Sequence, residues 1–128
     1  MSKIGAFWIA ILVLALAGCA SSSSPVAAPN MELSVLPDPP RVGPATATFV
    51  LSDDSGSPLA GARLHLEATM THPGMMPVLA DAVETEPGRY EAPFEFTMAG
   101  DWVVIVTMEL PDGLTAEGQF EIFGVKAE

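Results

Sequence analysis

The sequence predicts an all-β protein, an immunoglobulin-like antiparallel β-sandwich of about seven strands, over residues 31–124. Beyond residue 30, no stretch of helical length carries apolar residues at the spacing of an amphipathic helix. Short runs instead alternate between apolar and polar residues, and Gly, Pro and Asp interrupt them at the intervals typical of a sandwich. Because the sequence has one cysteine, packing must hold this fold without a disulfide.

The N-terminal segment has the pattern of a secretion signal. Lys3 supplies a positive charge, and the apolar run of residues 4–17 is shorter than the roughly 20 residues of a membrane-spanning helix. We therefore expect a signal-peptide helix over residues 1–18. The run ends in Leu-Ala-Gly before Cys19, which resembles a lipobox, so we expect the Cys19 thiol to carry a diacylglycerol with acyl chains such as palmitate. An uncleaved membrane anchor is the alternative.

The expected lipid places the protein in the cell envelope, anchored to a membrane and facing outside the cytoplasm. Residues 19–30 are rich in Ser, Ala and Pro and predict a flexible tether between lipid and domain. The lipoprotein resemblance further implies sorting to the outer membrane, if the host has one, because Ala20 rather than Asp follows Cys19.

The composition of the mature chain limits its partners. Removal of residues 1–18 leaves 110 residues, enough for one domain. These carry 16 acidic and four basic residues, a net charge of −12. Such a surface repels nucleic acid and anionic lipid headgroups and attracts cations, so nucleic-acid binding is excluded.

The first three expected strands end at clear breaks. Residues 31–36 precede a Pro-Asp-Pro-Pro sequence, and residues 46–52 precede the turn-rich residues 53–58. Residues 62–70 alternate most clearly, with one face apolar and the other polar. The apolar face holds Ala62, Leu64, Leu66, Ala68 and Met70, and the polar face holds Arg63, His65, Glu67 and Thr69.

The remaining strands follow in the same way. Residues 78–84 form a weaker strand before a Glu-Pro-Gly turn. In residues 89–96 the inward side chains are Tyr90, Ala92, Phe94 and Phe96, while Pro93 predicts a sheet edge or a bulge. The strand expected over residues 102–109 is apolar on both faces through residues 103–106, which predicts a central strand covered on both sides. A Pro-Asp-Gly turn then leads into residues 114–123.

Four segments, in their order and spacing, resemble the YtkA-like domain family, which is related to the extracytoplasmic domain of FixH-type proteins. They are residues 56–62 (GSPLAGA), 70–77 (MTHPGMMP), 87–90 (PGRY) and 98–102 (MAGDW). The resemblance covers residues 32–123 and implies an immunoglobulin-like sandwich outside the cytoplasmic membrane. It also implies a setting of copper or respiratory-oxidase handling. FixH-type proteins keep a transmembrane helix, whereas we expect a cleavable signal in this chain.

Methionine and histidine usage indicates a candidate Cu(I) site. Met70, His72, Met75 and Met76 fall within seven residues. Thioether sulfur is a soft ligand that suits Cu(I), and imidazole is a good co-ligand. The loop after the third strand should lie at the same end of the sandwich as the loop that carries Met98. The candidate ligands are therefore His72, Met75, Met76, Met98 and Met70, with Trp102 placed for a cation–π contact and Asp101 as an outer carboxylate.

Structural roles for the same residues stay open. Met70 shares its face with Leu64 and Leu66, which favours packing in the core. Met98 precedes a tight turn and could plug the end of the sandwich, and Trp102 is first a core residue. Met75 and Met76 cannot both point inward from a Pro/Gly loop, so at least one should be exposed. His65 and Met108 are expected to be surface and structural residues, respectively.

No catalytic pattern accompanies these residues, and we expect a protein that is not an enzyme. The sequence lacks HExxH, CxxC, P-loop and GxGxxG patterns, and residues 53–56 (DDSG) favour a hairpin turn over a calcium loop.

Two candidate functions remain for this chain. The first is weak Cu(I) binding for transfer to a copper-handling partner, which needs His72 and a loop Met to converge with Met98. The second is a metal-free interaction module for an envelope protein, in a setting such as oxidase assembly, which needs an exposed apolar patch or a free strand edge.

Overall fold

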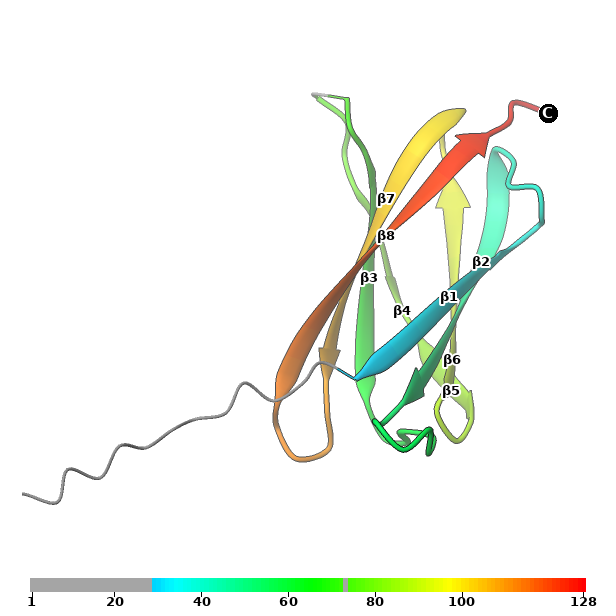
Figure 1. Ribbon diagram of the computed structural model, residues 1–128. Coiled ribbons are helices and arrows are strands. Elements are labelled where there is room, and N and C mark those ends of the chain that lie inside the picture. The colour runs from blue at the N-terminus through cyan, green and yellow to red at the C-terminus, as the bar shows by residue number, and fades with distance from the viewer. Residues whose placement is uncertain (1–28, 73) are drawn as a thin grey trace, which may run out of the picture.

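The fold is a sandwich of two four-stranded antiparallel sheets, seen in a computed structural model that describes residues 29–72 and 74–128 (Figure 1). This confirms the predicted immunoglobulin-like, all-β class. The expected signal, the lipidated Cys19 and most of the tether lie outside the described residues. Within the described part of the chain, no helix is long and apolar enough to cross a membrane.

The sandwich has eight strands, one more than the sequence predicts. In chain order they are β1 (Asn30–Leu36), β2 (Gly43–Ser52), β3 (Arg63–Met70), β4 (Val78–Asp81), β5 (Val83–Glu86), β6 (Arg89–Phe96), β7 (Gly100–Glu109) and β8 (Thr115–Val125). One sheet has the order β1-β2-β6-β5, and the other has the order β4-β3-β7-β8.

The extra strand comes from residues 78–84, which the sequence predicts as one strand. The chain leaves one sheet after Asp81 and enters the other at Val83. The Ala82 N–H donates to the Leu64 carbonyl, at 3.0 Å, where β3 begins to pair with β4. The crossing therefore leaves β4 hydrogen-bonded to β3 and β5 hydrogen-bonded to β6.

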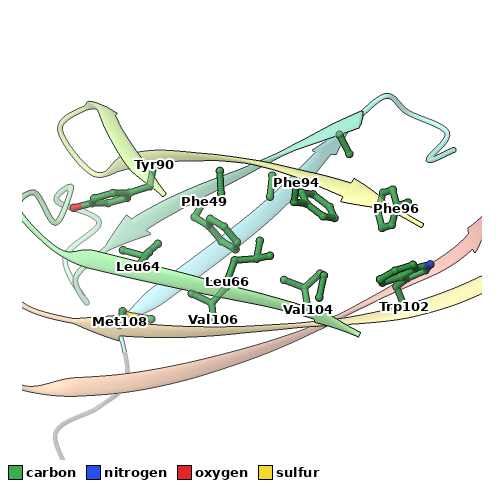
Figure 2. Close-up of a cluster of buried hydrophobic side chains, with 14 of the residues drawn as sticks. Phe49, Leu64, Leu66, Tyr90, Phe94, Phe96, Trp102, Val104, Val106 and Met108 are labelled. Carbon is green, nitrogen blue, oxygen red and sulfur yellow. The ribbon is translucent and has the colours of Figure 1, made fainter. Parts of the chain in front are cut away.

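The core fills the space between the two sheets, as their period-two alternation requires. Figure 2 shows Tyr90 at one end of the buried cluster and Trp102 at the other. The aromatic rings of Phe94 and Phe96, and of Phe96 and Trp102, pack edge to face with centroids 4.8 Å and 5.3 Å apart. The inward faces predicted for residues 62–70 and 89–96 are confirmed: Leu64, Leu66, Ala68, Met70, Tyr90, Ala92, Phe94 and Phe96 are buried.

Two local predictions need correction. Strand β7 is central in its sheet, between β3 and β8, but Val103 and Ile105 on its outer face are only half-buried, because none of the strands that the structure describes packs as a third layer on them. Strand β6, which contains Pro93, is not an edge strand, because it lies between β2 and β5. However, β5 pairs with β6 only from Arg89 to Glu91, so Pro93 sits where β2 is its one neighbouring strand. A missing N–H is tolerated there.

Candidate functional site

Two methionine-bearing loops leave neighbouring strands at one end of the sandwich. Met70, the last residue of β3, pairs with Trp102 near the start of β7. The loop after β3 and the loop before β7 therefore share this end, as the sequence predicts. We call it the sulfur-rich end, made of Met70, His72, Met75, Met76 and Met98. In Figure 1 the β3–β4 loop stands at the upper left, and the start of β7 lies to its right.

The donors at the sulfur-rich end differ in exposure. The side chain of Met76 is 84% exposed and that of Met98 is 52% exposed. His72 is also exposed, whereas Met75 is half-buried and packs against the core. The structure thus leaves two thioethers and one imidazole open to solvent. These donors come from two loops, with His72 and Met76 on the β3–β4 loop and Met98 on the β6–β7 connection.

Met70 belongs to the core beneath this surface, which is the structural alternative considered for it. Its side chain is only 5% exposed. Its Cε atom lies directly under Gly100, where an added Cβ would come within 2.7 Å of it. Gly100 also has a φ of +129°, so both the space and the backbone favour glycine at this position.

Trp102 fixes the backbone that carries Met98. Its indole Nε1–H donates to the Met98 carbonyl, at 3.0 Å, and its side chain is 1% exposed. The ring faces are therefore covered by protein atoms, so a cation–π contact with a surface ion would require the end of the sandwich to open. The observed role of Trp102 is to close the core and hold the turn while the Met98 side chain stays exposed.

Asp101 is tied to the end of β8. Its Oδ1 accepts a hydrogen bond from the Gly124 N–H, at 2.8 Å. The β7–β8 register shifts at this point, between Gly100 and Trp102, so the carboxylate satisfies a backbone group beside the irregularity. The structure therefore gives Asp101 a partner on β8.

His65 lies on the outer face of β3, away from the sulfur-rich end. Its Nδ1 is 2.8 Å from Oδ1 of Asp81, which faces it from β4. The pair borders a hollow of about 200 Å³ with Arg63 and Glu109. The sequence could not reveal this pair because it depends on the β3–β4 register. Across the described residues, no group of three or more His, Cys, Asp or Glu side chains is placed to hold a metal ion.

The acidic residues 53–56 form a hairpin turn, as predicted. The Asp53 carboxylate accepts hydrogen bonds from the Ser55 hydroxyl, at 2.7 Å, and from the Ser55 and Ser57 N–H groups. These bonds, led by that of the Ser55 hydroxyl, lower the pKa of Asp53. The carboxylate oxygen is thus engaged within its own loop.

A second feature, which the sequence analysis missed, is a groove between the edge strands β1 and β8. It has a volume of about 410 Å³, and both apolar and polar residues line it. We call it the β1/β8 groove, lined by Leu33, Ser34, Val35, Asp38, Pro40, Phe120, Glu121, Ile122 and Phe123. Its rim includes Phe123, which is 67% exposed. The alternation in the two strands predicts their inward residues, but not that the strands border one opening.

The sequence profile of YtkA-like domains matches residues 27–107, more than half of the chain. The chain belongs to the YtkA-like family. The matched region runs from just before β1 almost to the end of β7, so it includes both loops of the sulfur-rich end. None of the curated proteins matches the sequence.

The YtkA-like sandwich is similar to two solved structures. The soluble domain of PmoD from Methylocystis sp. ATCC 49242 (Rockwell) superposes with a TM-score of 0.51 at 13% identity, over 77% of this chain and 90% of that one. MtrC from Shewanella baltica OS185 gives a TM-score of 0.50 at 13% identity, over 77% of this chain and 22% of that one. At these identities the similarity concerns the fold alone.

Proposed function

We propose that this YtkA-like protein is a non-enzymatic, lipid-anchored envelope protein that binds Cu(I) weakly at its sulfur-rich end and passes it to a partner. The observation that carries the proposal is the exposure of His72, Met76 and Met98 on two loops that share one end. Thioether with imidazole is a ligand set suited to Cu(I), and the exposure of these side chains leaves their sulfur and nitrogen atoms accessible to the ion.

The arrangement of the donors favours transfer over storage. Met98 lies on a different loop from His72 and Met76, and all three side chains are exposed. Cu(I) bound there would remain accessible to a competing ligand on another protein. Thioether ligands also do not titrate, so the contribution of Met76 and Met98 to binding would not depend on pH.

The direction of the chain supports a surface-anchored role. Strand β1 begins at Asn30, which pairs with Ser52 at the end of the sandwich opposite the sulfur-rich end (Figure 1). A lipid on Cys19 would therefore hold the opposite end near the membrane. The sulfur-rich end would face away from the membrane, where a partner can reach it, and the net charge of −12 on the mature chain would attract the cation.

The test is a Cu(I) titration of residues 29–128 against a chromophoric chelator, which omits the competing Cys19 thiol. We expect one Cu(I) per chain, with a loss of about tenfold in affinity, or 1.4 kcal/mol, for His72→Ala and for Met76→Leu combined with Met98→Leu. Leucine keeps the apolar volume and removes the sulfur. Circular dichroism and a cooperative thermal transition first establish that each variant is folded.

The matched control is Met108→Leu, which removes a sulfur that is buried at the far end of β7. This variant should bind Cu(I) as the parent protein does. If the chelator outcompetes the parent protein completely, or if the loop variants and the control bind equally, the sulfur-rich end is not a Cu(I) site.

A metal-free interaction module is the second candidate function, and the β1/β8 groove favours it. Phe123 is an exposed apolar side chain at its rim, and among the described strands β1 and β8 are each at the edge of a sheet. The two candidates occupy different parts of the molecule, since the sulfur-rich end lies on β3 and β7 and the groove lies between β1 and β8. They can therefore be tested separately.

A further inference from the structure

The free edge of β8 already receives one short parallel segment of its own chain. Residue Arg41, in the β1–β2 connection, forms a parallel bridge with Lys126 just beyond β8. The Val42 N–H donates to the Lys126 carbonyl, at 2.8 Å, and the Lys126 N–H donates to the Pro40 carbonyl, at 3.0 Å. This bridge joins the two sheets at one end of the β1/β8 groove.

Beyond the bridge, the strands that the structure describes leave the rest of this edge unpaired. Strand β8 runs for 11 residues, and within the described chain it pairs with β7 alone. Strand β1 likewise pairs only with β2 among the described strands. Unpaired strand edges beside an apolar groove are templates for an added strand, which gains backbone hydrogen bonds and buries apolar side chains.

We infer that an extended segment of a partner protein, with alternating basic and apolar residues, adds to the free edge of β8 in the β1/β8 groove. This inference deepens the second candidate function and is independent of Cu(I) binding. The inward side chains of the segment would contact Phe120 and Ile122 of β8 and Leu33 of β1, which line the groove. Its outward side chains would lie beside the outward row of β8.

The outward row of β8 defines the charge of the partner. Glu117 and Glu121 are both exposed there, on either side of Gln119. Opposite charges on neighbouring strands stabilise pairing, and like charges oppose it. Lys or Arg on the added strand would therefore pair with both glutamates.

The two glutamates on the outward face of β8 also disfavour binding of a second copy of this chain in the groove. Antiparallel pairing of two β8 strands about Gln119 would place Glu117 of each copy opposite Glu121 of the other. The net charge of −12 on the mature chain adds repulsion between copies. A basic partner matches the edge, whereas self-pairing does not.

The experiment uses the full chain in nanodiscs and a fluorescent nonapeptide of alternating Lys and Val. We expect saturable binding by fluorescence anisotropy, with slowed amide exchange in β8 on peptide addition. A peptide with Pro at two central Val positions, which cannot complete a strand, should not bind. Glu117→Lys combined with Glu121→Lys should weaken binding by about tenfold, since two favourable pairs become unfavourable.

The control is Glu86→Lys combined with Glu95→Lys, which changes the net charge equally on the other sheet. It should leave the peptide affinity within about twofold, because charge at a distance is screened. If both double substitutions weaken peptide binding equally, the peptide responds only to the net charge of the protein, and the inference is overturned. If the peptide instead slows amide exchange at β4 or β5, the protein still binds an added strand, but at another sheet edge and not in the β1/β8 groove.

Two other occupants would also contradict the inference. If sedimentation shows dimers that Glu121→Lys alone strengthens, since Glu117 of each copy would then face Lys at position 121 of the other, a second copy fills the groove. If β8 amides are already protected without peptide, and deletion of residues 20–28 exposes them, the chain's own tether fills it. Neither result would alter the Cu(I) titration, so failure here and failure of the copper proposal are distinguishable.

Discussion

At the scale of single residues, Tyr90 shows how a buried polar group is satisfied across a loop. Its hydroxyl donates to the Leu59 carbonyl, at 2.7 Å, and accepts from the Ala62 N–H, at 3.0 Å. These bonds attach β6 to the segment that leads into β3. Burial raises the pKa of Tyr90 to about 12, and the negative charge of Glu84 acts in the same direction.

Tyr90 should therefore make stability depend on alkaline pH. In the unfolded chain a tyrosine ionises near pH 10, so between about pH 10 and 12 the unfolded state releases a proton that the folded state retains. We expect the free energy of unfolding to fall through this window by about 2 to 3 kcal/mol. Urea denaturation at several pH values measures the slope.

Tyr90→Phe is the matched variant for this measurement. It should cost about 1 to 2 kcal/mol at pH 7, because the Leu59 and Ala62 backbone groups lose their partner. The variant should then lose less stability than the parent protein between pH 10 and 12. An equal alkaline loss in both proteins would show that Tyr90 is not its source.

Residue patterns could also predict part of the candidate site. The sequence correctly predicts that the two methionine loops share an end, since that follows from strand order, and that at least one of Met75 and Met76 is exposed. The Trp102 bond to the Met98 carbonyl and the His65–Asp81 pair could not be predicted. Each depends on strand register or loop conformation, which alternation alone leaves undetermined.

At the scale of elements, alternation predicted most strands because each sheet has one face in the core. Alternation failed at residues 78–84. The alternating burial pattern continues through Ala82 without a break, although β4 before it belongs to one sheet and β5 after it belongs to the other. No Gly or Pro marks that crossing. The β1/β8 groove was missed for a related reason, since it arises between strands from opposite ends of the sequence.

The turn between β5 and β6 gives a prediction at this scale. Gly88 has a φ of +78°, and an added Cβ would come within 2.7 Å of the Pro58 side chain and 2.9 Å of the Leu51 carbonyl. Gly88→Ala therefore combines backbone strain with a clash against backbone. We expect it to lower the free energy of unfolding by more than the roughly 1 to 2 kcal/mol of a left-handed alanine alone, measured by urea denaturation.

Gly113→Ala supplies the comparison for that variant. Gly113 has a similar φ of +86° but no atom within 4 Å of an added Cβ. It should show the strain alone, about 1 to 2 kcal/mol. Equal losses in the two variants would contradict the close contact of the β5–β6 turn with the β2–β3 connection.

At the scale of the whole molecule, the sandwich separates three regions. The chain enters β1 at one end, the sulfur-rich end lies at the other, and the β1/β8 groove runs along one side. This separation would let a membrane anchor, an exchangeable metal and a partner strand act without overlapping. The acidic surface favours both proposed ligands, a metal cation and a basic segment.

The central claim is that exposed thioethers at the sulfur-rich end bind Cu(I). The most direct measurement follows the ¹³C ε-methyl signals of the methionines by NMR during Cu(I) addition. The proposal predicts that the Met76 and Met98 signals shift saturably, while the signal of Met108, buried at the opposite end of β7, does not move. Unchanged Met76 and Met98 signals at Cu(I) excess, or uniform shifts of every methionine, would contradict it.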